Sequence, residues 1–144
     1  MTTALPDVNV LIALIDPVHV HHDAAHDWFA RTGSHSWATC PLTENGVIRI
    51  VSHPRYPGNP GPPGAIADLL GRLCVLPGHT FWPDDVSLLD ASRIDNSRLL
   101  SHTQVTDTYL LALARAHHGT LATFDRRLVI AAVPGGAESL HVIG

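Results

Sequence analysis

Two acidic residues occupy positions where the sequence pattern calls for apolar side chains. Glu44 begins an i, i+3, i+4, i+7 series over residues 44–51 whose other members are valine and isoleucine. Asp107 begins a series of the same spacing over residues 107–114, which is otherwise leucine and alanine. Residues with this spacing lie on one face of a helix. We therefore expect both carboxylates on the inward face, where a buried charge without a partner is costly.

Two further aspartates stand beside segments that have the pattern of strands. Asp7 follows the short apolar segment 4–6, and Asp125 follows the strand-like segment 121–124. Open α/β sheets place their ligands at the carboxyl ends of strands. Each acid alone has an ordinary structural explanation: Asp107 suits the positive end of a helix dipole and Asp125 suits a turn. Four carboxylates that converge would instead require a cation, and oxygen ligands select Mg²⁺ or its substitute Mn²⁺.

The elements that position these acids alternate along the chain. Short apolar segments and helical segments follow one another, which is typical of β-α units and a mainly parallel sheet. Strands are expected at 4–6, 36–39, near 79–82, at 120–123 and at 140–143. Helices are expected at 8–15, 22–30, 41–51, 65–73, 86–93 and 106–118, the last with a threonine at its start and Gly119 just past its end. The proline- and glycine-rich segment 53–64 is expected to be an exposed loop.

Length and composition indicate one folded domain over residues 1–144. Of these 144 residues, 45% are hydrophobic and only 15% are charged, which excludes intrinsic disorder. The longest apolar run covers residues 10–15, far short of the roughly 20 residues that a membrane span needs. The N-terminus lacks the pattern of a signal peptide, so we expect a cytoplasmic protein without membrane contact. The two cysteines, Cys40 and Cys74, are expected to be reduced core residues.

The basic residues are all arginine, because the chain contains no lysine. Chemistry that needs an amine is therefore excluded, including Schiff bases and a P-loop lysine. The formal net charge of −4 argues against a broad basic surface for nucleic acid, although it allows local arginine contacts. We name Arg126, Arg98 and His102 as candidate substrate-binding residues.

Four ordered segments read L-P-D-V-N-V-L-I-A-L, T-E-N-G-V-I-R-I, V-T-D-T-Y-L-L-A-L-A and L-A-T-F-D-R-R-L. Together they resemble the four motifs of PIN-domain ribonucleases, and most closely those of the VapC toxins of bacterial toxin–antitoxin modules. The resemblance covers nearly the whole chain, and the ordered set is more specific than any single motif. No motif of the family falls in residues 53–64.

The resemblance implies a three-layer α/β/α sandwich around a mainly parallel sheet and a Mg²⁺-dependent endoribonuclease. It gives the catalytic and metal-binding positions to Asp7, Glu44, Asp107 and Asp125, and the supporting polar positions to Asn9 and Thr123. It also implies a homodimer, with apolar material around residues 28–29 and 65–73. A VapB-like antitoxin is the implied partner, and we expect it to place a basic side chain among the acids.

The expected reaction is attack by a metal-activated water on an RNA phosphodiester, which leaves a 5′-phosphate and a 3′-hydroxyl. An aspartate-nucleophile phosphatase is disfavoured, because Asn9 stands where a second acid is needed and lysine is absent. The remaining alternative is a non-catalytic PIN-like module that binds RNA or protein, although all four acids are present. His22 and His26 have a spacing that could bind zinc, but we expect a solvated helix start because no carboxylate motif accompanies them.

Overall fold

The computed structural model describes residues 2–144, in which five parallel strands form one sheet of order β3-β2-β1-β4-β5. The strands are β1 (Ala4–Pro6), β2 (Trp37–Thr39), β3 (His79–Phe81), β4 (Thr120–Thr123) and β5 (Leu140–Val142). The chain moves outward from β1 to β2 and β3 on one side, and returns to β4 and β5 on the other. The order therefore reverses next to β1, and the carboxyl ends of β1 and β4 border the crevice where such sheets bind ligands.

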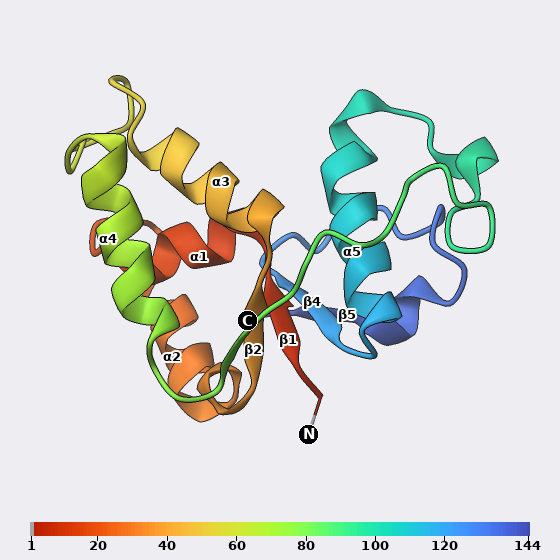
Figure 1. Ribbon diagram of the computed structural model, residues 1–144, viewed down its shortest axis with the longest axis horizontal. Helices are drawn as coiled ribbons and strands as arrows, with labels where there is room; N and C mark the ends of the chain where they lie inside the picture. Colours follow the sequence, from red (N-terminus) through yellow and green to blue (C-terminus); the bar gives the residue numbers. More distant parts are fainter. Residues whose placement is uncertain (1) are drawn as a thin grey trace.

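Helices cover both faces of this sheet (Figure 1). One layer holds α1 (Val8–Ile15), α2 (His22–Arg31), α3 (Pro41–Val51) and α4 (Pro63–Cys74), and the opposite layer holds α5 (Val105–Ala116). Short 3-10 helices occupy Gly33–His35, Asn96–Arg98, His102–Gln104 and Gly136–Ser139. The expected three-layer α/β/α sandwich with a parallel sheet is confirmed.

Each face of the sheet has its own apolar core. On the α1 face, residues 10–14 are all buried and pack with the fully buried Trp37. On the other face, the leucines of α5 pack on Leu5 and Leu121. Trp28 and Phe29 of α2 are only 7% and 8% exposed, so they belong to the first core. These two side chains are therefore covered by the chain itself, and the expected homodimer stays a prediction.

Helix α1 begins and ends where local chemistry dictates. The Asp7 side chain accepts a hydrogen bond from the Val10 amide and caps the first turn. Asp16 leaves the helical conformation immediately before a proline, which disfavours helix in the preceding residue. The free carbonyls of the last turn bond to imidazole nitrogens of α2: His22 contacts that of Ala13 at 2.7 Å and His26 that of Leu14 at 2.8 Å. This capping replaces the solvated helix start expected for these histidines.

Three predicted elements differ from the observed structure. Residues 86–93 form turns and not a helix, because Ser87 and Asp90 accept hydrogen bonds from backbone amides two residues ahead and so compete with helix formation. Helix α5 starts at Val105, without the expected threonine cap, and continues directly from a 3-10 turn capped by Ser101 and Gln104. Helix α4 starts at Pro63, so the proline- and glycine-rich loop is shorter than expected.

No helix in residues 2–144 is long and apolar enough to cross a membrane.

The link between α5 and β4 requires a residue without a side chain. A Cβ on Gly119 would lie 2.4 Å from the Thr3 carbonyl oxygen and 2.8 Å from the Trp82 ring, whereas one on Gly71 of α4 would meet nothing within 4 Å. We expect Gly119→Ala to lower the free energy of unfolding by about 2 kcal/mol. Gly71→Ala should leave it unchanged or raise it by up to about 1 kcal/mol, since alanine favours helix. Urea denaturation of both variants measures the difference, and equal stabilities would contradict the close packing at Gly119.

Candidate metal centre

Asp7 is the most buried acid at the carboxyl edge of the sheet. It follows β1 directly, and its side chain is 9% exposed. One carboxylate oxygen accepts the Val10 amide hydrogen bond at 2.9 Å, and the other accepts from the Thr123 hydroxyl at 2.6 Å. Burial, together with the nearby charges of Asp107 and Asp125, raises the pKa of Asp7 to about 6, against the effect of these two hydrogen bonds. Asp7 therefore lies where a positive charge is favoured.

Asp107 approaches the same place from the opposite layer of helices. It lies in the first turn of α5 and is half-buried, and burial and the charge of Asp125 raise its pKa. Within residues 2–144 no hydrogen bond contributes to its pKa. The expectation that Asp107 faces inward is met, and its carboxylate is available to a ligand.

Asp125 completes a group of three acids that act on one another. It follows β4, and its backbone amide donates to the Thr123 hydroxyl at 3.0 Å. Thr123 is thus bonded to both Asp125 and Asp7. The Asp125 side chain is exposed and accepts a hydrogen bond from the Arg127 amide at 2.8 Å.

A cavity of about 310 Å³ joins Asp7 and Asp107. Asn9 also lines it, and apolar side chains from α1, α3 and α5 complete the wall: Val8, Ile12, Ile50 and Leu110. The space therefore lies between helices that Figure 1 shows on opposite faces of the sheet. Two carboxylates against apolar walls are weakly screened, so their charges act strongly on anything that enters.

Glu44 does not line this cavity. Its carboxylate accepts a hydrogen bond from the Thr39 hydroxyl at 2.7 Å, and that hydroxyl also contacts Nε2 of His79 at 2.8 Å. The charge of Glu44 acts on His79, whose pKa is nevertheless lowered by burial. In this structure Glu44 therefore lies outside the cavity, and its convergence with the other carboxylates stays a prediction.

The donor set at the cavity fits a hard cation that keeps most of its water. No three His, Cys, Asp or Glu side chains of residues 2–144 are grouped closely enough to enclose a metal ion. Mg²⁺ does not require such a cage, since proteins commonly bind it through one or two carboxylates together with waters and substrate phosphates. Asp7 and Asp107 provide two carboxylates of this kind, and Asn9 adds an amide oxygen at the rim.

The candidate substrate-binding residues are spread over the surface. Arg98 lies 3.4 Å from Asp95 as an exposed ion pair, and Arg126 donates to the Gly144 carbonyl. His102 is exposed in the 3-10 turn that precedes α5. None of the three lines the cavity.

Two residues near the cavity have partners that the sequence pattern did not reveal. His19 contacts Asn9 between Nε2 and Oδ1 at 3.0 Å, and the His21 ring stacks on Phe124. Both histidines come from the loop between α1 and α2, which folds back over the start of α1. The one sequence feature that could have indicated these contacts is the histidine-rich segment that directly follows α1, the helix that Asp7 caps.

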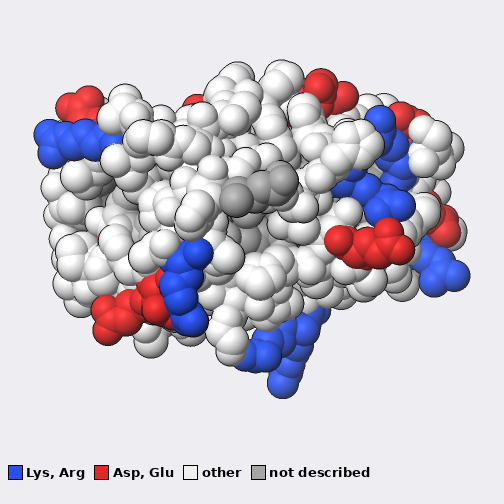
Figure 2. Space-filling view, turned by 90° about the horizontal axis from the view of Figure 1, so that it is seen from below, with Lys and Arg blue, Asp and Glu red and all other residues white. Residues whose placement is uncertain are grey.

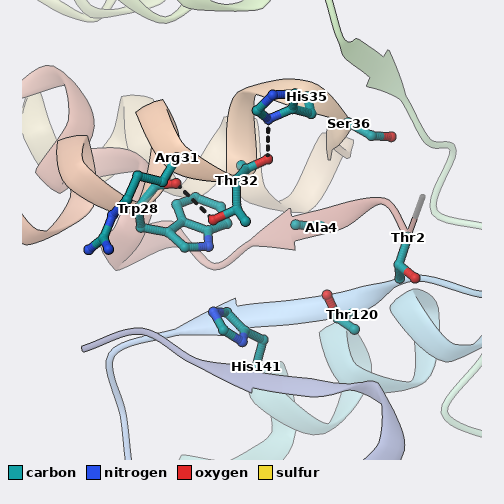
Figure 3. A pocket seen from close by; sticks show the side chains of 10 residues that line it. Thr2, Ala4, Trp28, Arg31, Thr32, His35, Ser36, Thr120 and His141 are labelled. Carbon is teal, nitrogen blue, oxygen red and sulfur yellow. Dashed lines mark hydrogen bonds between the residues drawn. The ribbon is translucent and has the colours of Figure 1, made fainter.

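Larger hollows lie away from the three acids, between α2 and β5. Two adjoining spaces of about 410 and 460 Å³ share Trp28, Arg31, Thr32 and His141 between α2 and β5 (Figure 3). Arg31 is paired there with Asp27, and none of the candidate catalytic residues lines either space. Size alone would have favoured this edge, whereas the arrangement of acids identifies the other one.

Comparison with known proteins agrees with this geometry. The family model described as PIN domain matches residues 4–134. The chain is 49% identical over 135 residues to Ribonuclease VapC44 of Mycobacterium tuberculosis, covering 94% of each protein. It is 46% identical over 138 residues to Ribonuclease VapC39 of the same organism, covering 96% of this chain and 99% of the relative. The fold is also that of the crystal structure of Mycobacterium tuberculosis VapC20, described as a sarcin-ricin loop cleaving toxin, with a TM-score of 0.62, 12% identity and coverage of 90% and 95%.

The raised pKa of Asp7 predicts a stability that falls as the pH rises. Between its ordinary pKa of 3.8 and about 6, the folded chain holds a proton that the unfolded chain has lost, so deprotonation opposes folding in this window. We expect Asp7→Asn to have nearly wild-type stability at pH 4 and to exceed it by about 1–3 kcal/mol at pH 8 in EDTA, since each pKa unit corresponds to about 1.4 kcal/mol. Thermal melting at the two pH values measures this difference. A variant less stable than the wild type at pH 8 would show that the carboxylate has a structural partner.

Proposed function

The chain belongs to the PIN-domain family, and on that basis we propose that it is a Mg²⁺-dependent endoribonuclease, the toxin of a toxin–antitoxin pair of the VapC type. The observation that supports this proposal most directly is the buried carboxylate of Asp7 beside Asp107 and Asp125 at the switch point of the sheet. The charges of Asp107 and Asp125 raise the pKa of Asp7, so this arrangement of acids favours a cation.

In this proposal Asp7 and Asp107 hold the ion directly, and Asp125 orients a water beside it. The Thr123 hydroxyl fixes the rotamer of Asp7 and links it to the Asp125 backbone. The helix amide of Val10 holds the second Asp7 oxygen, so the carboxylate is preorganised before any ligand enters. Asn9 supports the rim of the cavity.

A Mg²⁺ ion held by Asp7 and Asp107 would lower the pKa of a bound water and would neutralise charge on the phosphodiester. Because Asp7 and Asp107 are assigned to the ion and Asp125 to a water, none of these side chains is the nucleophile. Water is therefore the attacking group. The products are then a 5′-phosphate and a 3′-hydroxyl. The apolar wall of Ile12, Ile50 and Leu110 excludes bulk water from one side of the reacting group.

Glu44 keeps a catalytic role in this proposal, although it acts from outside the cavity as the structure stands. Its hydrogen bond with Thr39 holds it beside β2, at the same carboxyl edge of the sheet. A Glu44 that turns toward the cavity would complete the set of four acids when substrate and ion are present.

We also propose that residues 1–144 act as one cytoplasmic domain with a VapB-like antitoxin as partner. The names of the relatives imply this pairing, and the negative cavity suits a guanidinium group, which can pair with two carboxylates. A homodimer remains part of the proposal. The exposed Val75 and Leu76, which follow α4, supply apolar surface for it in place of the buried α2 side chains.

Cleavage of RNA by the purified chain, free of any partner, tests the proposed function. We expect cleavage with Mg²⁺ that EDTA abolishes, and Asp7→Asn and Asp107→Asn should each lower the rate at least about 100-fold, because each removes a proposed metal ligand. Glu44→Gln should have a smaller effect, since Glu44 lies outside the cavity. Mapping of the product ends checks the chemistry.

The matched control is Asp68→Asn, an exposed acid on α4, which should leave the rate unchanged. Cyclic phosphate ends would contradict attack by water. RNA binding without cleavage at any Mg²⁺ concentration would favour the non-catalytic module instead.

The distribution of arginines predicts a shallow salt dependence of RNA binding. Figure 2 shows basic side chains in separate groups on the face at the amino ends of the strands, with acids beside most of them. Within residues 2–144, five arginines have no acidic partner among the observed ion pairs: Arg49, Arg55, Arg72, Arg126 and Arg127. Three or four such contacts give a slope of roughly −2 to −3 for log binding constant against log salt concentration. Binding of single-stranded RNA by the Asp7→Asn protein across a salt series measures the slope, and one steeper than about −5 would require a further basic surface.

A further inference from the structure

The loop between α1 and α2 carries histidines to the rim of the cavity. Val18 and Val20 point outward and are 90% and 87% exposed, while His19 between them is half-buried. His19 contacts Asn9, which lines the cavity with Asp7 and Asp107. The contact between His19 and Asn9 therefore holds the loop against the first turn of α1, close to the proposed reaction centre.

His21 extends this arrangement with an aromatic stack. Its ring lies on the ring of Phe124 with centroids 4.6 Å apart and planes inclined by 22°. Phe124 is half-buried against the core, and it stands between Thr123, which bonds to Asp7, and Asp125. The His21 side chain is exposed, and its partner Phe124 directly precedes Asp125 in the chain.

We propose that His21, supported from below by Phe124, is a platform on which one unpaired RNA base stacks next to the carboxylate cavity. This inference rests on the proposed ribonuclease function. Proteins recognise single-stranded RNA by stacking its bases on aromatic side chains, histidine among them. A flat ring held by a half-buried second ring loses little freedom when a base stacks on it.

The charge of the chain gives an independent reason for such a contact. The net charge is −4, and the cavity itself repels phosphate in the absence of a cation. Attraction between arginines and phosphates therefore supplies only part of the binding. A stacking surface attracts a base without adding charge, and it would fix the register of the strand so that the neighbouring phosphate reaches Asp7 and Asp107.

Binding of two oligomers with equal charge tests the platform. The probes are a ten-nucleotide oligoadenylate RNA and an abasic ribose-phosphate oligomer of the same length, each bound to the full chain carrying Asp7→Asn and measured by fluorescence anisotropy with Mg²⁺. His21→Ala should weaken binding of the oligoadenylate about tenfold, as expected for one lost stacking contact. It should leave binding of the abasic oligomer unchanged. His21→Phe, which keeps an aromatic ring, should bind both oligomers as the parent does.

The control is His35→Ala, which changes an exposed histidine in the groove at the opposite edge of the sheet and should alter neither affinity. Equal weakening of both oligomers by His21→Ala, or no weakening of either, would overturn the platform. Failure of His21→Phe to restore oligoadenylate binding would also overturn it. Cleavage by the chain with Asp7 intact separates the two ideas: loss of the platform with Mg²⁺-dependent cleavage present refutes only this inference, whereas absence of cleavage refutes the function on which it rests.

Discussion

The structure depends on one buried carboxylate at the junction of two strands and a helix. Asp7 ends β1, caps α1 and accepts a hydrogen bond from Thr123 at the end of β4. Its pKa of about 6 shows that the cost of burial exceeds the stabilisation from both hydrogen bonds. These bonds fix the side chain in one orientation but leave its charge uncompensated. A group held in this way is stable as part of the fold and incomplete without a cation.

The elements around Asp7 increase this demand for positive charge. The reversal of strand order next to β1 opens a crevice there, and α5 enters it from the opposite face with Asp107 in its first turn. The apolar side chains between the two helical layers keep the local screening low. The site is therefore created by topology as much as by residue type, since the same acids on an exposed helix would repel one another weakly in water.

The sequence pattern predicted the features that depend only on the spacing of residues within one helix or strand. The inward position of Asp107 followed from the helical period, and the place of Asp7 followed from a strand that ends just before it. The position of Glu44 could not be obtained in this way, because periodicity selects a helix face and not a rotamer. Its partner Thr39 is in turn bonded to His79, 40 residues further along the chain. The capping of α1 by His22 and His26 was missed for the same reason, because it depends on how two helices pack.

The two edges of the sheet show why chemistry and not volume locates the candidate site. The larger hollows lie between α2 and β5. However, Arg31 in them already has an acidic partner, and the ring of His35 contacts the Thr32 carbonyl. Polar groups satisfied within the chain gain little from a ligand. At the carboxyl ends of the strands the acids repel one another, and no hydrogen bond from the described residues, 2–144, stabilises the charge of Asp107. Any cation that enters gains free energy there, whether it is a metal ion or a guanidinium group. One electrostatic feature would therefore account both for the proposed activity and for its proposed inhibition by a basic partner.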